Sequence, residues 1–151
     1  MHRQYIDTPL GLMRISASEV GITEANFILV SEQKAAHPSA ITQLAATQLT
    51  AYFAGKLQQF TLPLAASGTE FQQQVWQQLT KVPFATTCSY AAIAQQIGRP
   101  KAMRAVGAAN GRNPIAIIVP CHRVIGASGK LTGYAGGLDK KAWLLKHEQH
   151  L

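Results

Sequence analysis

The segment that most constrains this chain is the apolar run that ends at Pro120. Residues 115–119 are mainly β-branched, which predicts a short buried strand or extended segment. Pro120 has no backbone N–H to donate, so it ends regular strand pairing. A thiol, an imidazole and a guanidinium follow at once, in Cys121, His122 and Arg123. We therefore expect the fold to present Cys121 at the edge of its core.

Cys121 alone does not indicate chemistry, because free cysteine is among the most buried residue types. Its two neighbours change this interpretation. A charged and a titratable side chain beside a buried thiol are costly to remove from water, and a nearby imidazole lowers a thiol pKa and supplies thiolate. The sequence Cys121-His122-Arg123 therefore favours a nucleophilic cysteine over an ordinary buried one.

Composition limits the classes of protein to consider. The chain has 151 residues, of which 47% are hydrophobic and 14% charged, enough for one compact domain or two small ones. It has no stretch near the about 20 apolar residues of a membrane span and no apolar signal-peptide core at its start. With only Cys88 and Cys121, and no Cys/His cluster of zinc-site spacing, we expect a cytoplasmic protein with reduced thiols, no metal, no cofactor and no membrane contact.

The positive charge is unevenly distributed along the chain. Residues 1–66 contain four basic and four acidic side chains, whereas residues 67–151 contain ten basic and three acidic ones, a net charge of +7. This asymmetry indicates a polyanionic partner for the second part. A basic, well-solvated surface without such a partner would give the same count. The charge alone therefore does not decide between a polyanionic partner and a merely basic surface.

Residues 1–66 predict a scaffold and carry no recognisable chemistry. Turn signals divide residues 2–30 into apolar segments, as in a small antiparallel sheet whose last strand covers residues 22–30. Apolar residues at three- and four-residue steps over residues 41–53, followed by Gly55, predict one helix.

The second part of the chain is mostly helical by its pattern. Thr69 and Gln72 form a capping-box pattern at the start of one helix. Residues 89–98 and 101–110 predict two short helices joined by a tight turn, a helix-turn-helix. The expected fold class is α+β, with a sheet-plus-helix domain at residues 1–66 and a helical domain at residues 67–151.

The second helix of that motif has an unusual surface. A recognition helix for the major groove needs side chains that pair with base edges, whereas this helix is rich in alanine and glycine. Such a smooth surface with long cations suits the minor groove of duplex DNA. Packing of both helices into a core is the alternative. The expected DNA contacts are Arg99, Lys101, Ala102, Arg104 and Gly107.

Two segments after the helix-turn-helix lie near the thiol in sequence. Asn113 precedes a proline and is held extended, so it is either a turn residue or a hydrogen-bond partner of the Cys–His segment. Residues 126–137 contain five glycines and Tyr134, which predicts a loop able to approach a flat ligand closely.

The last helix supplies the remaining acid. Asp139 is its expected cap, and Leu138, Ala142 and Leu145 its expected apolar stripe. Glu148 borders that stripe. It is either an exposed surface residue or the carboxylate that orients His122, as in an activated nucleophile.

Together these motifs resemble the O6-alkylguanine-DNA alkyltransferases. The similarity covers residues 71–148 and is weaker before them. It rests on Pro-Cys-His-Arg-Val at 120–124, Arg-Ala-Val-Gly at 104–107, Asn-Pro at 113–114 and Gly-Tyr-Ala-Gly-Gly-Leu at 133–138. The resemblance implies a single-turnover repair protein that flips an O6-alkylated guanine from the duplex and moves its alkyl group to one cysteine. O4-alkylthymine is a second candidate substrate.

The resemblance also implies roles for individual residues. Cys121 is the alkyl acceptor, His122 removes its proton through a water, and Glu148 supports His122. Asn113 holds this segment, and Tyr90 lies near the flipped nucleotide and assists proton delivery. We expect a monomer acting on double-stranded DNA that contains O6-alkylguanine. The implied contacts are Arg104, which fills the gap in the base stack, and the pocket residues Tyr134, Val124, Gly136 and Ala135.

The sequence departs from the family pattern at two positions and leaves one other class open. Ala85 replaces a glycine found in many members, and Ala135 replaces a serine found in some. The competing hypothesis is a non-enzymatic helix-turn-helix module that binds DNA or senses damage, although such a module needs no reactive thiol beside His122. A cysteine hydrolase fits poorly, because it needs a direct contact between cysteine and histidine.

Overall fold

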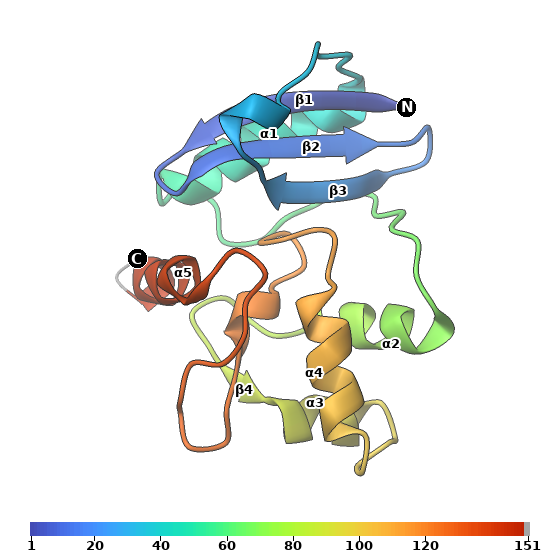
Figure 1. Ribbon diagram of the computed structural model, residues 1–151, viewed down its shortest axis with the longest axis vertical. Coiled ribbons are helices and arrows are strands. Elements are labelled where there is room, and N and C mark those ends of the chain that lie inside the picture. Colours follow the sequence, from blue (N-terminus) through green and yellow to red (C-terminus); the bar gives the residue numbers. More distant parts are fainter. Residues whose placement is uncertain (150–151) are drawn as a thin grey trace. The chain divides into compact units, whose positions relative to one another are not determined.

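The computed structural model describes residues 1–149 and divides the chain into two units, Met1–Ser67 and Gly68–Leu151. The first unit contains a three-stranded sheet and one long helix, and the second contains four helices around short strands (Figure 1). The expected α+β class is confirmed. No helix among residues 1–149 is long and apolar enough to cross a membrane.

The sheet of the first unit is antiparallel and has the strand order β1-β2-β3. Strands β1 (His2–Thr8) and β2 (Gly11–Ala17) pair from His2↔Ala17 to Thr8↔Gly11, and β2 pairs with β3 (Ile22–Phe27). The expected strand at residues 22–30 ends early at Phe27, because the next residues turn into the short 3-10 helix η1 (Val30–Glu32). The Glu32 carboxylate accepts the Leu29 N–H at 2.8 Å and stabilises this turn.

Helix α1 (Ala40–Phe53) covers one face of the sheet (Figure 1). Its N-terminus is fixed by Ser39, whose hydroxyl accepts the Thr42 N–H, and it ends before Gly55, which has a φ of +77°. The core of this unit is apolar and includes Met13, Ile15, Ile22, Leu49 and Tyr52, all 0% exposed. The unit therefore has the predicted sheet-plus-helix structure.

The second unit begins with helix α2 (Glu70–Leu79), whose predicted capping box is present. The Thr69 hydroxyl accepts the Gln72 N–H, and the Gln72 side chain accepts the Thr69 N–H. Trp76 is buried, and its indole N–H donates to the carbonyl of Ala109 at 2.8 Å, which joins α2 to helix α4 (Met103–Gly111).

The predicted helix-turn-helix consists of α3 (Tyr90–Gln96) and α4 (Met103–Gly111), which pack together. Ser89 caps α3, and Gly98 reverses the chain with a φ of +77°. Helix α4 begins two residues later than expected, because Ala102 still belongs to the turn and donates its N–H to Arg99.

Residues 115–119 do not form the expected strand. Ile117 has a φ of +73°, and the N–H of Val119 donates to the carbonyl of Ile115 at 3.0 Å, so the segment is a tight buried turn. The Asn113 side chain bonds to both ends of this turn and replaces the partner that a strand ladder would supply. The 3-10 helix η2 (Cys121–Arg123) follows directly, and strand β5 (Val124–Ile125) then pairs in parallel with β4 (Cys88–Ser89).

Helix α5 (Leu138–Gln149) differs from its expected pattern in two ways. Asp139 lies inside the first turn of the helix, whereas the expected cap would be the residue just before that turn. The expected stripe of Leu138, Ala142 and Leu145 is wrong: Leu138 is 47% exposed and Ala142 is exposed. The buried side chains are Lys141, Leu144 and Glu148, which share one helical face at steps of three and four residues.

Candidate active site

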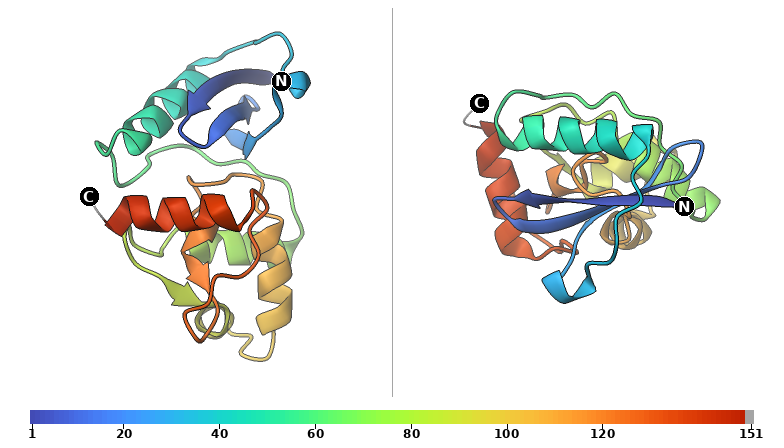
Figure 2. Two further views of the ribbon diagram at one scale, coloured as in Figure 1. Left: turned by 60° about the vertical axis from the view of Figure 1, so that its left-hand side comes forward. Right: turned by 90° about the horizontal axis from the view of Figure 1, so that it is seen from above.

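Cys121 is presented by a rigid backbone and not by a strand end. The segment that carries it lies between α4 and α5 (Figure 2). Its N–H donates to the carbonyl of Val119 at 2.8 Å, and its carbonyl accepts the side-chain amide of Asn110, on α4, at 3.3 Å. Cys121 is 6% exposed, so its thiol lies at the boundary of the core.

Asn113 holds the turn that precedes the Cys–His segment. Its amide donates to Val119 at 2.8 Å, and its carbonyl oxygen accepts the N–H of Ile115 at 3.0 Å. Its side chain also acts to lower the pKa of the Cys121 thiol, against the larger effect of burial. The side-chain hydrogen bonds of Asn113 thus hold the turn that leads into Cys121, and its role toward the Cys–His segment stays a prediction.

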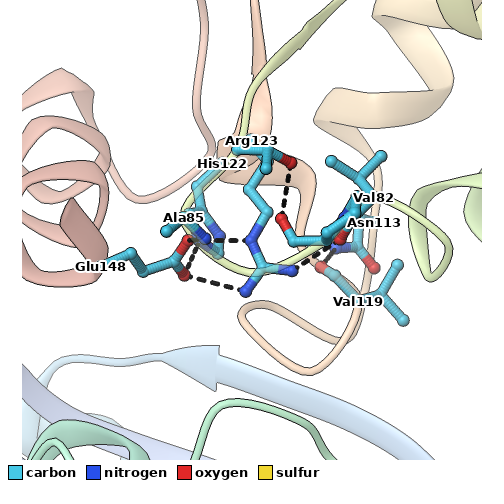
Figure 3. Close-up of polar contacts among 9 residues, drawn as sticks. Val82, Ala85, Asn113, Val119, His122, Arg123 and Glu148 are labelled. Atoms are coloured by element: carbon cyan, nitrogen blue, oxygen red, sulfur yellow. Dashed lines mark hydrogen bonds and ion pairs between the residues drawn. The ribbon is translucent and has the colours of Figure 1, made fainter. Parts of the chain in front are cut away.

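Glu148 is a buried residue at the centre of a polar network. Its carboxylate contacts Nε2 of His122 at 2.6 Å and accepts two hydrogen bonds from the Arg123 guanidinium, at 2.9 and 3.0 Å (Figure 3). The same carboxylate accepts the N–H of Ala85 at 3.3 Å, and Arg123 donates to the carbonyl of Val82 at 2.8 Å. All three ionisable side chains are at most 6% exposed. Such a buried network contributes little net stability but fixes geometry.

This network determines the proton positions on His122. A carboxylate paired with arginine only accepts hydrogen bonds, so Nε2 carries the hydrogen and Nδ1 is the free acceptor. Nδ1 is buried and has no protein partner within residues 1–149. Complete burial lowers the pKa of His122, while Glu148 acts in the opposite direction by stabilising the cation. The imidazole is therefore neutral near pH 7 and able to accept one proton.

The thiol itself is not ionised without help. Burial raises the pKa of Cys121 above its ordinary value, and the Asn113 hydrogen bond and the positive charge of Lys141 oppose that rise. A nearby base and these two groups are the means by which this site can form a thiolate.

The expected pocket residues lie around the loop between β5 and α5. Val124 is fully buried in β5, and burial raises the pKa of Tyr134, whose hydroxyl has no partner among the described residues. At Gly136 a Cβ would stand 3.0 Å from the Tyr134 ring, so a larger residue there would require the ring to shift. Ala135 is exposed. Tyr90 lies on α3, and its hydroxyl oxygen is 2.7 Å from the hydroxyl oxygen of Thr132 in this loop.

The expected DNA contacts lie at the turn between α3 and α4 and along α4. Arg99, Lys101 and Arg104 are exposed, and Ala102 is partly exposed. The Arg99 guanidinium lies over the Phe71 ring, 5.6 Å from its centre. Gly107 faces inward, since a Cβ there would stand 3.8 Å from the ring of Tyr90.

Three residues of the site had been given no role from the sequence: Asn110, Arg123 and Lys141. For Arg123, its position beside His122 is the sequence feature that indicates a buried role. A buried guanidinium requires a carboxylate partner, which here is Glu148. The charge pattern assigns Lys141 to the surface, although it lies three and seven residues before the buried Leu144 and Glu148. Within residues 1–149, no three His, Cys, Asp or Glu side chains come together as metal ligands.

Comparison with known proteins establishes the family. The family model for the 6-O-methylguanine DNA methyltransferase DNA binding domain matches residues 70–150, and the model for its ribonuclease-like domain matches residues 1–66. The methylated-DNA–protein-cysteine methyltransferase of Methanosarcina acetivorans is 49% identical, with 98% of each chain covered. Its counterpart from Mycobacterium leprae is 47% identical, covering 99% of this chain and 93% of the relative. A crystal structure of Mycobacterium tuberculosis OGT in complex with DNA matches with a TM-score of 0.90 and 47% identity, covering 99% and 94% of the two chains.

The chain belongs to the 6-O-methylguanine DNA methyltransferase family. Its activity is the transfer of a methyl group from methylated DNA to a protein cysteine, which repairs the DNA by direct reversal. The sequence left two classes of protein open, a methyltransferase and a non-enzymatic DNA-binding module. The comparisons support the methyltransferase.

Proposed function

We propose that Cys121 is the alkyl acceptor and that each molecule reacts once. The observation that carries this proposal is the buried chain of contacts from Glu148 to His122, the residue next to Cys121. Cys88, the other free thiol, has no such neighbours in sequence. The expected substrate is O6-alkylguanine in double-stranded DNA, with O4-alkylthymine as the second candidate.

The proposed reaction uses the groups in the order of their contacts. Nδ1 of His122 takes the thiol proton through a water, and Glu148 stabilises the imidazolium that forms. The Cys121 sulfur then forms a bond to the alkyl carbon as the bond from that carbon to O6 breaks. The guanine leaves with the electron pair of that bond and gains a proton, for which the Tyr90 hydroxyl is the proposed donor. The product thioether contains no good leaving group, so the acceptor is consumed.

The substrate base must leave the duplex before the sulfur can reach it, at a cost of a few kcal/mol. We propose that α4 binds the minor groove and that Arg104 occupies the space of the flipped base. The exposed position of Arg104 and the exposed alanines 105 and 108 on the same helix support this assignment. Tyr134, Val124, Gly136 and Ala135 are the proposed walls for the flipped base.

The protein is proposed to act as a monomer in the cytosol, where its DNA substrate lies. Every group in the proposed reaction comes from one chain, and both cysteines are free thiols, as the reaction requires. No second copy is needed to complete the site.

The test of the proposed function is intact-mass measurement after incubation with a duplex that contains O6-methylguanine. We expect the mass of one methyl group to be added, and peptide mapping to place it on Cys121. The variant Cys88→Ala should react like the wild type, whereas Cys121→Ala should gain no mass and still bind DNA. A methyl group on Cys88, or no gain in mass, would overturn the assignment.

A further inference from the structure

The hydroxyl of Thr132 contacts the proposed proton donor, and the proposed reaction does not yet use it. Thr132 lies in the loop between β5 and α5, and Tyr90 is the first residue of α3. The two hydroxyl oxygens lie 2.7 Å apart, which is a hydrogen bond between residues 42 positions apart in sequence. The contact is partly buried, and either hydroxyl can donate. It therefore joins α3 to the loop that contains the proposed pocket residue Tyr134.

The loop holds Thr132 in one place. Its backbone carbonyl accepts the ammonium group of the buried Lys141 at 2.7 Å. Its methyl group lies beside Gly126, where a Cβ would stand 3.5 Å from the methyl carbon, and the Gly126 N–H donates to the carbonyl of Lys130 at 2.9 Å. Threonine has few side-chain rotamers, because its Cβ is branched. With the backbone and the methyl group in place, the position of the hydroxyl oxygen is fixed as well.

The ring of Tyr90 is held from the other end. Ser89 caps α3 by accepting the Ala92 N–H at 3.1 Å, so the helix begins at Tyr90. A Cβ at Gly107 would stand 3.8 Å from the Tyr90 ring, so the ring lies close to the backbone of α4. The hydroxyl at the tip of this ring therefore meets Thr132 from a defined direction.

The Tyr90 oxygen can accept a hydrogen bond from Thr132 while its own hydrogen is donated to another group. When Tyr90 gives this hydrogen to the leaving guanine, its oxygen keeps the electron pair of the broken O–H bond and becomes negative. A donor already aimed at that oxygen stabilises the charge where it develops. The Tyr90 oxygen then regains a proton from solvent water, and the imidazolium of His122 releases one, so the protons balance.

We propose, building on the proposed roles of Cys121 and Tyr90, that Thr132 is a positioning residue for alkyl transfer. By donating to the Tyr90 oxygen, its hydroxyl directs the Tyr90 hydrogen towards the leaving guanine and stabilises the negative charge that forms on that oxygen. An incidental contact between two surface hydroxyls would need neither a partly buried position nor a fixed backbone on both sides.

The test measures the rate of single-turnover transfer from a saturating duplex that contains O6-methylguanine, together with the affinity for that duplex. Thr132→Val keeps the shape of the side chain and removes the hydroxyl, whereas Thr132→Ser keeps the hydroxyl. Tyr90→Phe and the double variant Tyr90→Phe/Thr132→Val complete a double-mutant cycle. The matched control is Thr47→Val, which removes an exposed hydroxyl that bonds within α1 to the carbonyl of Gln43.

Thr132→Val is expected to lower the rate by about ten- to hundredfold, the range for loss of a hydrogen bond to a charged group. The affinity for the duplex should stay the same, because the proposed role lies in the reaction and not in binding. Thr132→Ser and Thr47→Val should react like the wild type. Tyr90→Phe should react slowly, and the double variant should be no slower, because Thr132 acts through Tyr90.

Several results would overturn the proposal. One is a wild-type rate for Thr132→Val, and another is a Thr132→Ser protein as slow as Thr132→Val. A Thr132→Val protein faster than the wild type would mean that the contact holds the pocket closed. Losses that multiply in the double variant would show that Thr132 acts apart from Tyr90. Should Thr132→Val not fold, Thr132→Ala replaces it with the same expected loss.

The design separates this proposal from the proposed function. If the wild type itself gains no mass, the role of Cys121 fails. If the wild type reacts and Tyr90→Phe is equally fast, the roles of Tyr90 and Thr132 fail together while that of Cys121 stands. If Tyr90→Phe is slow and Thr132→Val is not, only the role of Thr132 fails.

Discussion

At the scale of single residues, His122 couples the stability of the protein to pH. Its imidazole is 0% exposed, and burial lowers its pKa in the folded state below the ordinary value. The unfolded chain, with a histidine pKa of about 6.5, binds a proton at pH values where the folded state does not. Protons therefore favour the unfolded state as the pH falls through this range.

We predict that the free energy of unfolding decreases as the pH falls from about 7.5 to 5.5, by at most about 1.4 kcal/mol per pH unit from this residue. Urea unfolding at several pH values measures the slope. His122→Gln should give a shallower slope, whereas His37→Gln, at an exposed position, should keep the wild-type slope. Equal slopes for all three proteins would show that His122 has the same pKa in the folded and unfolded states, which contradicts the prediction.

At the scale of the structural elements, the turn that joins α2 to β4 carries a strained residue. Ala85 has a φ of +62°, in the left-handed region where a Cβ costs about 1–2 kcal/mol. Its N–H donates to Glu148, so the turn takes part in holding the carboxylate that contacts His122. The turn thus keeps a glycine-like conformation although the sequence has alanine at this position.

Ala85→Gly is predicted to raise the free energy of unfolding by about 0.5–1 kcal/mol, because relief of strain exceeds the entropy gained by the unfolded chain. Ala85 is exposed, so no burial is lost. The control is Ala127→Gly, at an exposed loop position where φ is not positive. No strain is relieved there, so this substitution should lower the free energy of unfolding slightly. Both changes can be measured by chemical denaturation, and a loss of stability in Ala85→Gly would refute the argument.

The elements that sequence analysis predicted well are those with local signals. The helix caps at Thr69 and Ser89 act through side chains within three residues, so their chemistry is visible in the sequence. The turn at residues 115–119 differs from the predicted strand because β-branched residues are typical of buried strands, and the positive φ of Ile117 is unusual for such a residue. Its conformation depends on the amide of Asn113, which sequence alone left with two roles.

The buried face of α5 was missed for a different reason. Two of its three buried residues are charged, and hydrophobic periodicity assigns charged residues to the surface. Their burial is made possible by partners from η2, β5 and the loop after β5, which no local pattern reveals. Around Cys121, sequence analysis therefore predicts the thiol, imidazole and carboxylate as one group, but not the buried cations Arg123 and Lys141 beside them.

At the scale of the whole molecule, the charge of the second unit is concentrated on its surface. Arg123, Lys141 and Glu148 are buried, which leaves eight basic and two acidic side chains on residues 67–151 outside the core. Residues 1–66 remain balanced, with four of each sign. A duplex is a dense line of phosphates, so this unit is the one expected to bind it and to release its counterions.

The salt dependence of DNA affinity tests this division. We predict that the affinity for an unmodified duplex falls linearly with salt on a logarithmic scale, with a slope of about 0.9 for each phosphate contact. Lys101 lies just before α4, and Lys101→Gln should reduce the salt slope by the amount expected for about one phosphate contact. Lys34→Gln changes the net charge equally in the first unit, at another exposed position, and should leave the slope unchanged. Fluorescence anisotropy over a salt series measures both slopes. Equal reductions for the two variants would mean that DNA interacts with both units, and that the charge of the second unit does not define the binding face.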